Sequence, residues 1–195
     1  MSLARRVGTS VSLVVAAALA LPIGASSALA KDEAILRLRA FAIDMNRSRT
    51  GSIDIVIERW STEQETEKLR GVLIEKGGDQ LLPALQKIKP RCGYVRTSNS
   101  LGWDLHFARE TVLSDGTRKI VVATDRPMTM WELRNAGRST DYEFSLAEIR
   151  LPAEGKGQGK AISMAKLSFD KEKNTLEIEN YEQQPVRLNE ITIVE

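Results

Sequence analysis

Apolar and polar residues alternate in short segments along most of the chain after residue 31, and turn residues separate these segments. A period of two is typical of strands with one buried face. Strands are expected at 35–45, 53–58, 92–97, 103–113, 118–124, 142–151, 160–169, 175–181 and 185–194, with a further short strand or irregular cover at 129–133. Eight or nine strands in this order favour a closed or nearly closed antiparallel barrel, or a sandwich. The predicted class is therefore mainly β (a β-rich α+β domain) over residues 31–195.

The period changes to that of helices over residues 61–89, which are expected to form a two-helix insert. Ser61 and Gln64 have the spacing of a capping box, and Leu69, Val72 and Leu73 follow at helical spacing. Gly77-Gly78 ends the first helix, and a second helix is expected over 80–88. The insert is interpreted as a cover over part of the sheet; a mobile lid is the alternative.

Two of the expected strands change their apolar phase partway along their length. In 142–151 the phase shifts between Leu146 and Ile149, and in 160–169 it shifts between Met164 and Leu167. We interpret both shifts as β-bulges. A barrel of about eight strands can hold one small ligand or be filled by its own side chains, and the alternation does not distinguish the two.

The first thirty residues have the pattern of an export signal. Arg5 and Arg6 precede an apolar stretch over 11–25, and Ala28-Leu29-Ala30 resembles a cleavage site. We expect cleavage near Ala30 and a periplasmic or secreted mature chain without a transmembrane segment. The alternatives are a retained anchor, for which the apolar stretch is short, and a twin-arginine signal.

Composition narrows the function classes. Without Arg5 and Arg6, the remaining chain keeps 26 of its 28 basic residues and all 26 acidic ones, so its formal charge is zero. A neutral domain without a basic block gives little reason to expect a nucleic-acid partner. The single Cys92 excludes an internal disulfide and a Cys-based zinc ribbon. Cys92 is expected to be a small buried residue, with a reactive or intermolecular thiol as the alternative.

One polar cluster follows from the expected hairpin at Asp115-Gly116. A loop of two or four residues there places His106 opposite Asp125, on a face that also carries Asp104, Glu110 and Lys119. His106, Asp125 and Asp104 could then form a general acid–base centre, while a polar outer sheet face explains the same residues without catalysis. A three-residue loop would shift this register. We expect no resident metal, although these three side chains could in principle hold one.

A second group of residues suggests ligand binding. Trp103, Leu105 and Phe107 are expected on one face of their strand. The aromatic and Met residues could line an apolar pocket, with ordinary core packing as the alternative; they are Trp103, Phe107, Met128, Met130, Trp131, Phe144 and Phe169. Arg96, beside Tyr94, could bind an anion or carboxylate, unless it pairs with Asp or Glu. Residues 128–131 form a candidate exposed apolar patch and a possible interface. The oligomeric state does not follow from these patterns.

No motif of a known catalytic or nucleotide-binding class is present in the sequence. It contains no G-x-S-x-G, P-loop, H-E-x-x-H or Rossmann glycine pattern, so no cofactor is expected. The alternating glycines at 155–159 are interpreted as a linker because the context of a strand followed by a helix is missing.

Four short segments resemble a group of exported bacterial proteins with no assigned activity. They are residues 92–97, 101–105, 123–127 and 141–142. The resemblance covers most of the mature chain and implies export, but it carries over no catalytic residues. We expect a non-catalytic module that binds a small apolar or amphipathic ligand, or a partner protein of the cell envelope. The alternatives are a hydrolase or isomerase that uses His106 and Asp125, and a structural envelope component.

Overall fold

The computed structural model describes residues 34–98, 100, 102–126, 144–170, 173, 175–180 and 184–194, and the account below concerns these residues. They belong to one compact unit. Its strands are β1 (Leu36–Asp44), β2 (Arg49–Ile57), β3 (Gly93–Thr97), β4 (Trp103–Val112), β5 (Arg118–Thr124), β6 (Phe144–Leu151), β7 (Gly157–Asp170), β8 (Thr175–Asn180) and β9 (Val186–Ile193). The expected strand at 129–133 lies outside the described residues.

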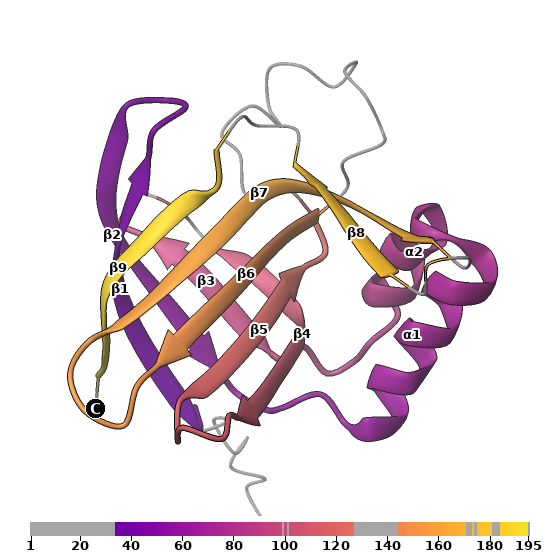
Figure 1. The fold of residues 1–195 in the computed structure, drawn as a ribbon, viewed down its shortest axis with the longest axis horizontal. Coiled ribbons are helices and arrows are strands. Elements are labelled where there is room, and N and C mark those ends of the chain that lie inside the picture. Colours follow the sequence, from indigo (N-terminus) through magenta and orange to yellow (C-terminus); the bar gives the residue numbers. More distant parts are fainter. Residues whose placement is uncertain are drawn as a thin grey trace, which may run out of the picture. The chain divides into compact units, whose positions relative to one another are not determined.

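Eight of these strands close into an antiparallel barrel (Figure 1). Strands β1 to β7 follow one another around the wall, and β9 fills the place between β7 and β1. Strand β8 lies outside the closed ring and pairs with the second half of β7, from Ala165 to Asp170. Of the two predicted architectures, the barrel is therefore the one found, with the two-helix insert between β2 and β3.

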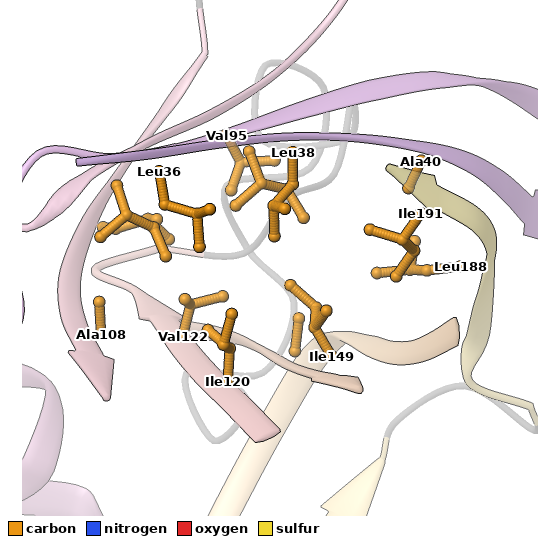
Figure 2. Close-up of a cluster of buried hydrophobic side chains, with 14 of the residues drawn as sticks. Leu36, Leu38, Ala40, Val95, Ala108, Ile120, Val122, Ile149, Leu188 and Ile191 are labelled. Atoms are coloured by element: carbon orange, nitrogen blue, oxygen red, sulfur yellow. The ribbon is translucent and has the colours of Figure 1, made fainter. Parts of the chain in front are cut away.

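Large aliphatic side chains fill the inside of the barrel (Figure 2). They alternate with outward-facing residues along the strands, which explains the period of two in the sequence. Leu38, Ile55, Ile120, Ile149 and Leu188 are at most 1% exposed. The cavity found among the inward-facing side chains has a volume of only about 10 Å³, at the lower limit for holding a single water molecule. The barrel interior is thus a packed core.

The insert consists of α1 (Glu63–Lys76), the short 3₁₀ turn η1 (Gly78–Gln80) and α2 (Leu81–Gln86). The capping box of α1 uses Thr62 and Glu65, one residue later than predicted. Ser61 is unavailable because its backbone N–H donates to the carbonyl of Ala108 and its hydroxyl accepts from the Ala108 N–H. The tie between Ser61 and β4 therefore moves the first capping residue to Thr62.

The helices pack against the outside of the barrel wall, beside β4 and the far end of β7 (Figure 1). A second apolar cluster joins the two layers. It contains Leu69, Leu81, Ala84, Leu85 and Ile88 from the insert, and Ala123, Phe144, Ala165 and Leu167 from the wall. Gly78 makes the closest approach, since a Cβ there would overlap the carbonyl oxygen of Leu167. Only glycine lets the insert lie this near to β7.

One of the two predicted bulges is found. Between β6 and β7, Leu146 pairs with Ile162 whereas Phe144 pairs with Ala165, so β7 carries one extra residue. Ile162 and Leu167 consequently both pack in the outer cluster. The bulge predicted in β6 is wrong, because burial alternates regularly along that strand. Phe144 and Leu146 are apolar for another reason: both pack against the outer apolar cluster, on the opposite face from the inward Ile149.

Candidate functional site

A large groove lies on the outside of the barrel, between the wall and the insert. Its volume is about 1020 Å³, at the upper end of the range of small-molecule sites and about a hundred times that of the cavity found in the lumen. Strands β4 to β9 and helices α1 and α2 contribute lining residues. They are Thr66, Leu69, Arg70, Leu73, Ile74, Leu81, Leu85, Phe107, Lys119, Val121, Ala123, Phe144, Leu146, Glu148, Arg150, Gln158, Gly159, Lys160, Ile162, Leu167, Phe169, Ile178, Pro185, Arg187 and Asn189.

The floor of the groove is apolar because the wall strands carry apolar residues on both faces. In β5, Ile120 and Val122 point into the lumen while Val121 lines the groove. In β6, Leu146 takes the same outward position, and in β7 Ile162 does. All three outward side chains remain partly exposed. Apolar floor surface is therefore open to solvent, where a ligand could cover it.

Charged side chains gather in the adjoining rows of the same wall. Two residues along from the apolar floor positions lie Lys119 on β5, Glu148 on β6 and Lys160 on β7. Lys160 pairs in register with Glu148 on one side and with Arg187 of β9 on the other. The groove thus changes from apolar to charged within two residues, or roughly 7 Å along a strand.

The carboxylate of Glu148 is shared by two cations. Lys119 Nζ lies 3.1 Å from Oε2, and Arg150 Nε donates to Oε1 at 2.8 Å. Partial burial acts to raise the pKa of Glu148, but the hydrogen bonds from Arg150 and Lys119 together outweigh it, so this pKa lies below its usual value. Glu148 is consequently a carboxylate at neutral pH with both oxygens engaged.

His106 and Asp125 do come together, although by a different register from the one predicted. The hairpin loop has three residues, because Leu113 bonds to Thr117 across residues 114–116. Leu105 pairs with Thr124, and His106 is the extra residue of a bulge in β4. The bulge places Nε2 of His106 3.5 Å from Oδ2 of Asp125. The expected direct cross-strand opposition is therefore wrong, while the expected proximity is found.

The His106 ring lies against the end of helix α2. His106 is 8% exposed, and its Nδ1 lies 3.0 Å from the carbonyl oxygen of Ile88. Since a carbonyl only accepts, Nδ1 is the donor. His106 is absent from the groove lining. This geometry ties the insert to the wall and offers little access to a substrate.

Asp104 does not join His106. Its carboxylate accepts from Arg91 at 2.7 Å, and the same guanidinium also bonds both oxygens of Glu58. Glu110 and Lys119 are likewise elsewhere engaged, with Arg118 and Glu148 respectively. The predicted cluster of carboxylates around His106 therefore reduces to Asp125. The competing ion pairs with Arg91, Arg118 and Lys119 explain the difference, because they hold the other charged groups away from His106.

Of the predicted pocket residues, Phe107, Phe144 and Phe169 line the groove. Leu105 belongs to the lumen core and Phe107 packs against the outer cluster, so the single face predicted for Trp103, Leu105 and Phe107 is wrong. The bulge at His106 again causes the change. Trp103 is half-buried in β4 and is not among the lining residues. Trp131 and the predicted patch 128–131 lie outside the described residues.

Tyr94 and Arg96 lie on β3, away from the groove lining. The guanidinium of Arg91 stands 5.1 Å from the centre of the Tyr94 ring, and that of Arg96 stands 5.9 Å away. Arg96 also reaches Asp54 at 3.4 Å, and Arg39 holds the other oxygen at 2.9 Å. The hydrogen bond from Arg39 is the main cause of the lowered pKa of Asp54. These cations face carboxylates of the chain itself.

Cys92 is fully buried in the lumen core, as the sequence suggested. Burial raises the pKa of its thiol, while the nearby Ser61 hydroxyl, 3.5 Å from the sulfur, acts in the opposite direction. Among the described side chains, no three His, Cys, Asp or Glu groups come together in a way that could hold a metal ion. Neither helix in the described part of the chain is long and apolar enough to cross a membrane.

The sequence did contain a signal for the groove. Ile120, Val121 and Val122 form an apolar run with no alternation, a pattern that indicates a strand covered on both faces. The phase shift in β6 has the same origin, since Leu146 faces outward and Ile149 inward. Together they indicate an outer face that another layer partly covers.

Comparisons with known proteins supply no relative. No protein-family model, no curated protein and no solved structure matches this chain.

Proposed function

We propose that this protein is a non-catalytic binding module that holds a small apolar or amphipathic ligand in the outer groove. The observation that supports the proposal is the contrast between the filled lumen and an open apolar groove of about 1020 Å³. A ligand there would remove apolar surface of the wall and helices from water, the main driving force for such binding. Polar groups at one end would orient it.

The groove is framed by elements that can position a ligand. Its floor consists of hydrogen-bonded barrel strands anchored by the packed lumen, so the floor changes little on binding. Its other side consists of a fourteen-residue helix whose capping box defines where the helix begins. Ligand sites placed on a rigid sheet beside a helical layer are common.

We also propose that the module acts outside the cytoplasm. The support is the sequence of residues 1–30, where a basic start, an apolar stretch and an A-x-A-like end follow one another. Cleavage after Ala30 would leave a chain of balanced charge that begins at Lys31. Its ligand or its partner would then belong to the cell envelope or the surroundings.

Native mass spectrometry on the full chain expressed in bacteria tests both proposals. We expect a mass that corresponds to residues 31–195, plus an added mass that is lost on denaturation. Titration calorimetry with dodecyl maltoside, a neutral single-chain amphiphile, should show one saturable site. A protein that carries no added mass and binds neither dodecyl maltoside nor any charged amphiphile of the same chain length would contradict the binding proposal.

A pair of variants localises the site. Leu146→Asp places a charge on the apolar floor and should abolish dodecyl maltoside binding. Phe41→Asp is the matched control, because Phe41 is also an exposed apolar residue of a barrel strand but lies outside the groove lining. Equal loss of binding in both variants would mean that the ligand does not occupy the groove.

A further inference from the structure

The charges that line the groove are strongly unequal in number. Arg70, Lys119, Arg150, Lys160 and Arg187 face one carboxylate, Glu148, among the described lining residues. Arg70 pairs with Glu67 of its own helix, and Lys119 and Arg150 share Glu148. Lys160 and Arg187 have no carboxylate partner in the described part of the chain. Counted over the described lining residues, the charged end of the groove therefore has an excess of positive charge.

Lys160 and Arg187 are also directly opposed in the sheet. They are register partners on β7 and β9, where side chains of neighbouring strands stand roughly 5 Å apart at Cβ. Like charges in directly opposed positions destabilise a sheet, whereas opposite charges stabilise it. Among the described residues, the acid opposite Lys160 on its other side is Glu148, whose two oxygens already bond Lys119 and Arg150.

From this arrangement we infer that the ligand of the groove is an anionic single-chain amphiphile, a long-chain carboxylate, whose head group lies between Lys160 and Arg187. The inference rests on the proposed function, since it specifies the ligand class of the same groove. A carboxylate has two oxygens and can accept from both cations at once, and guanidinium groups bind it with matched geometry. One bound head group would relieve the repulsion between Lys160 and Arg187.

The apolar part of the groove is correctly placed for the chain of such a ligand. Ile162 lies two residues from Lys160 on β7, and Leu146 lies two residues from Glu148 on the neighbouring β6. Leu69, Leu73 and Leu81 line the groove from the helical side. A chain that leaves the head-group position along the strands therefore passes directly onto apolar surface. The reverse orientation would put the charged head among the leucines.

Titration calorimetry on the full-chain protein tests the inference with three probes of equal chain length below their micelle concentrations. They are dodecanoate, neutral dodecyl maltoside and cationic dodecyltrimethylammonium. Dodecanoate should bind at least about tenfold more tightly than dodecyl maltoside, as expected for charge-assisted hydrogen bonds, and dodecyltrimethylammonium should bind most weakly. Added salt should reduce the advantage of dodecanoate, because the head-group position is exposed.

A charge variant and its control locate the head group. Lys160→Gln/Arg187→Gln should bring dodecanoate affinity down to that of dodecyl maltoside, whose own affinity stays unchanged. Arg49→Gln/Lys89→Gln removes the same charges from exposed positions outside the groove lining and should leave the dodecanoate advantage intact. Thermal unfolding of both variants checks that they fold. The comparison of the three probes on the unsubstituted protein tests the ligand class without any variant.

The outcomes separate the two proposals. Equal affinity for dodecanoate and dodecyl maltoside would overturn the anionic ligand class while leaving the binding groove intact. A dodecanoate advantage that survives in Lys160→Gln/Arg187→Gln would overturn the head-group position. Failure of all three amphiphiles to bind, together with the absence of any added mass in the native spectrum, would overturn the proposed function, and this inference with it.

Discussion

The lumen and the outer groove are two apolar regions built from the same strands, yet one is full and the other is open. Ile120, Val122 and Ile149 point into the packed lumen (Figure 2). The cavity found in the lumen has a volume of about 10 Å³. Val121 lies between Ile120 and Val122 in sequence, and Leu146 lies three residues before Ile149. Both face the outer groove of about 1020 Å³. The inner-face side chains are close-packed, as in crystals of small organic molecules, whereas the outer-face side chains leave apolar surface exposed to solvent. The fold thus separates the residues that stabilise the barrel from those that could bind a ligand.

The largest effect expected from this comparison is a difference in stability between two neighbouring truncations. Ile149→Ala leaves a cavity in a packed core and should cost about 2–5 kcal/mol of unfolding free energy. Leu146→Ala removes a partly exposed side chain from the groove floor and should cost about 1 kcal/mol or less. Urea unfolding measures both values.

Ligand affinity should show the opposite order. Leu146→Ala should weaken dodecanoate binding, while Ile149→Ala should leave it close to that of the unsubstituted protein at temperatures where the barrel remains folded. Equal unfolding costs for the two variants would contradict the comparison, because they would mean that the groove floor is packed as tightly as the lumen.

A smaller effect concerns the contact between the insert and the wall. His106→Ala leaves the carbonyl of Ile88 without its buried donor and should cost about 1–3 kcal/mol. His106→Asn retains a donor near the position of Nδ1 and should recover part of that loss. Hydrogen exchange should report faster opening of α2 in His106→Ala, whereas the lumen strands keep their protection.

The same variants bear on the acid–base hypothesis for His106. A structural tie requires the carbonyl contact, so His106→Ala and His106→Asn should differ in stability. If neither variant changed the unfolding free energy, the contact between His106 and the Ile88 carbonyl would not stabilise the fold. The hypothesis of a hydrolase or isomerase that uses His106 and Asp125 would then gain support.

Much of the fold could be predicted from the sequence because strand period and turn residues are local signals. The helical insert was predictable for the same reason, from the change of period near residue 61. The choice between a barrel and a sandwich was not predictable, because closure depends on β9 pairing with β1 at the other end of the chain as well as with β7. The register of β4 and β5 was missed because Asp115-Gly116 belongs to a three-residue loop, in which Gly116 has a φ of 82°.

The candidate site was harder to predict than the fold. A strand with apolar residues on both faces can lie in the middle of a sheet covered on both sides, or it can carry a groove on one side. The run 120–122 is the same in the two cases, and only the placement of the helices decides between them. The charged end was invisible for a similar reason, because Lys160 and Arg187 become neighbours only through the pairing of β7 with β9.

The smallest expected effect is a difference between the groove and the lumen in how the unfolding free energy depends on pH. Lys119 and Arg150 hold the pKa of Glu148 below its usual value, so the ionised form favours folding. This contribution is fully present above the unfolded pKa of about 4.3 and is lost as the pH falls through the lower folded value. It should stay below about 1 kcal/mol, since the side chain of Glu148 is 39% exposed and solvent screens the pair. The unfolding cost of Glu148→Gln should therefore disappear in acid, whereas that of Ile149→Ala, whose neighbours are apolar, should persist.

Glu154→Gln, in an exposed loop, is the control and should cost nothing at either pH. Because Glu148→Gln also releases two cations at the groove, it should tighten dodecanoate binding at neutral pH, and weaker binding would argue that Glu148 itself orients the ligand.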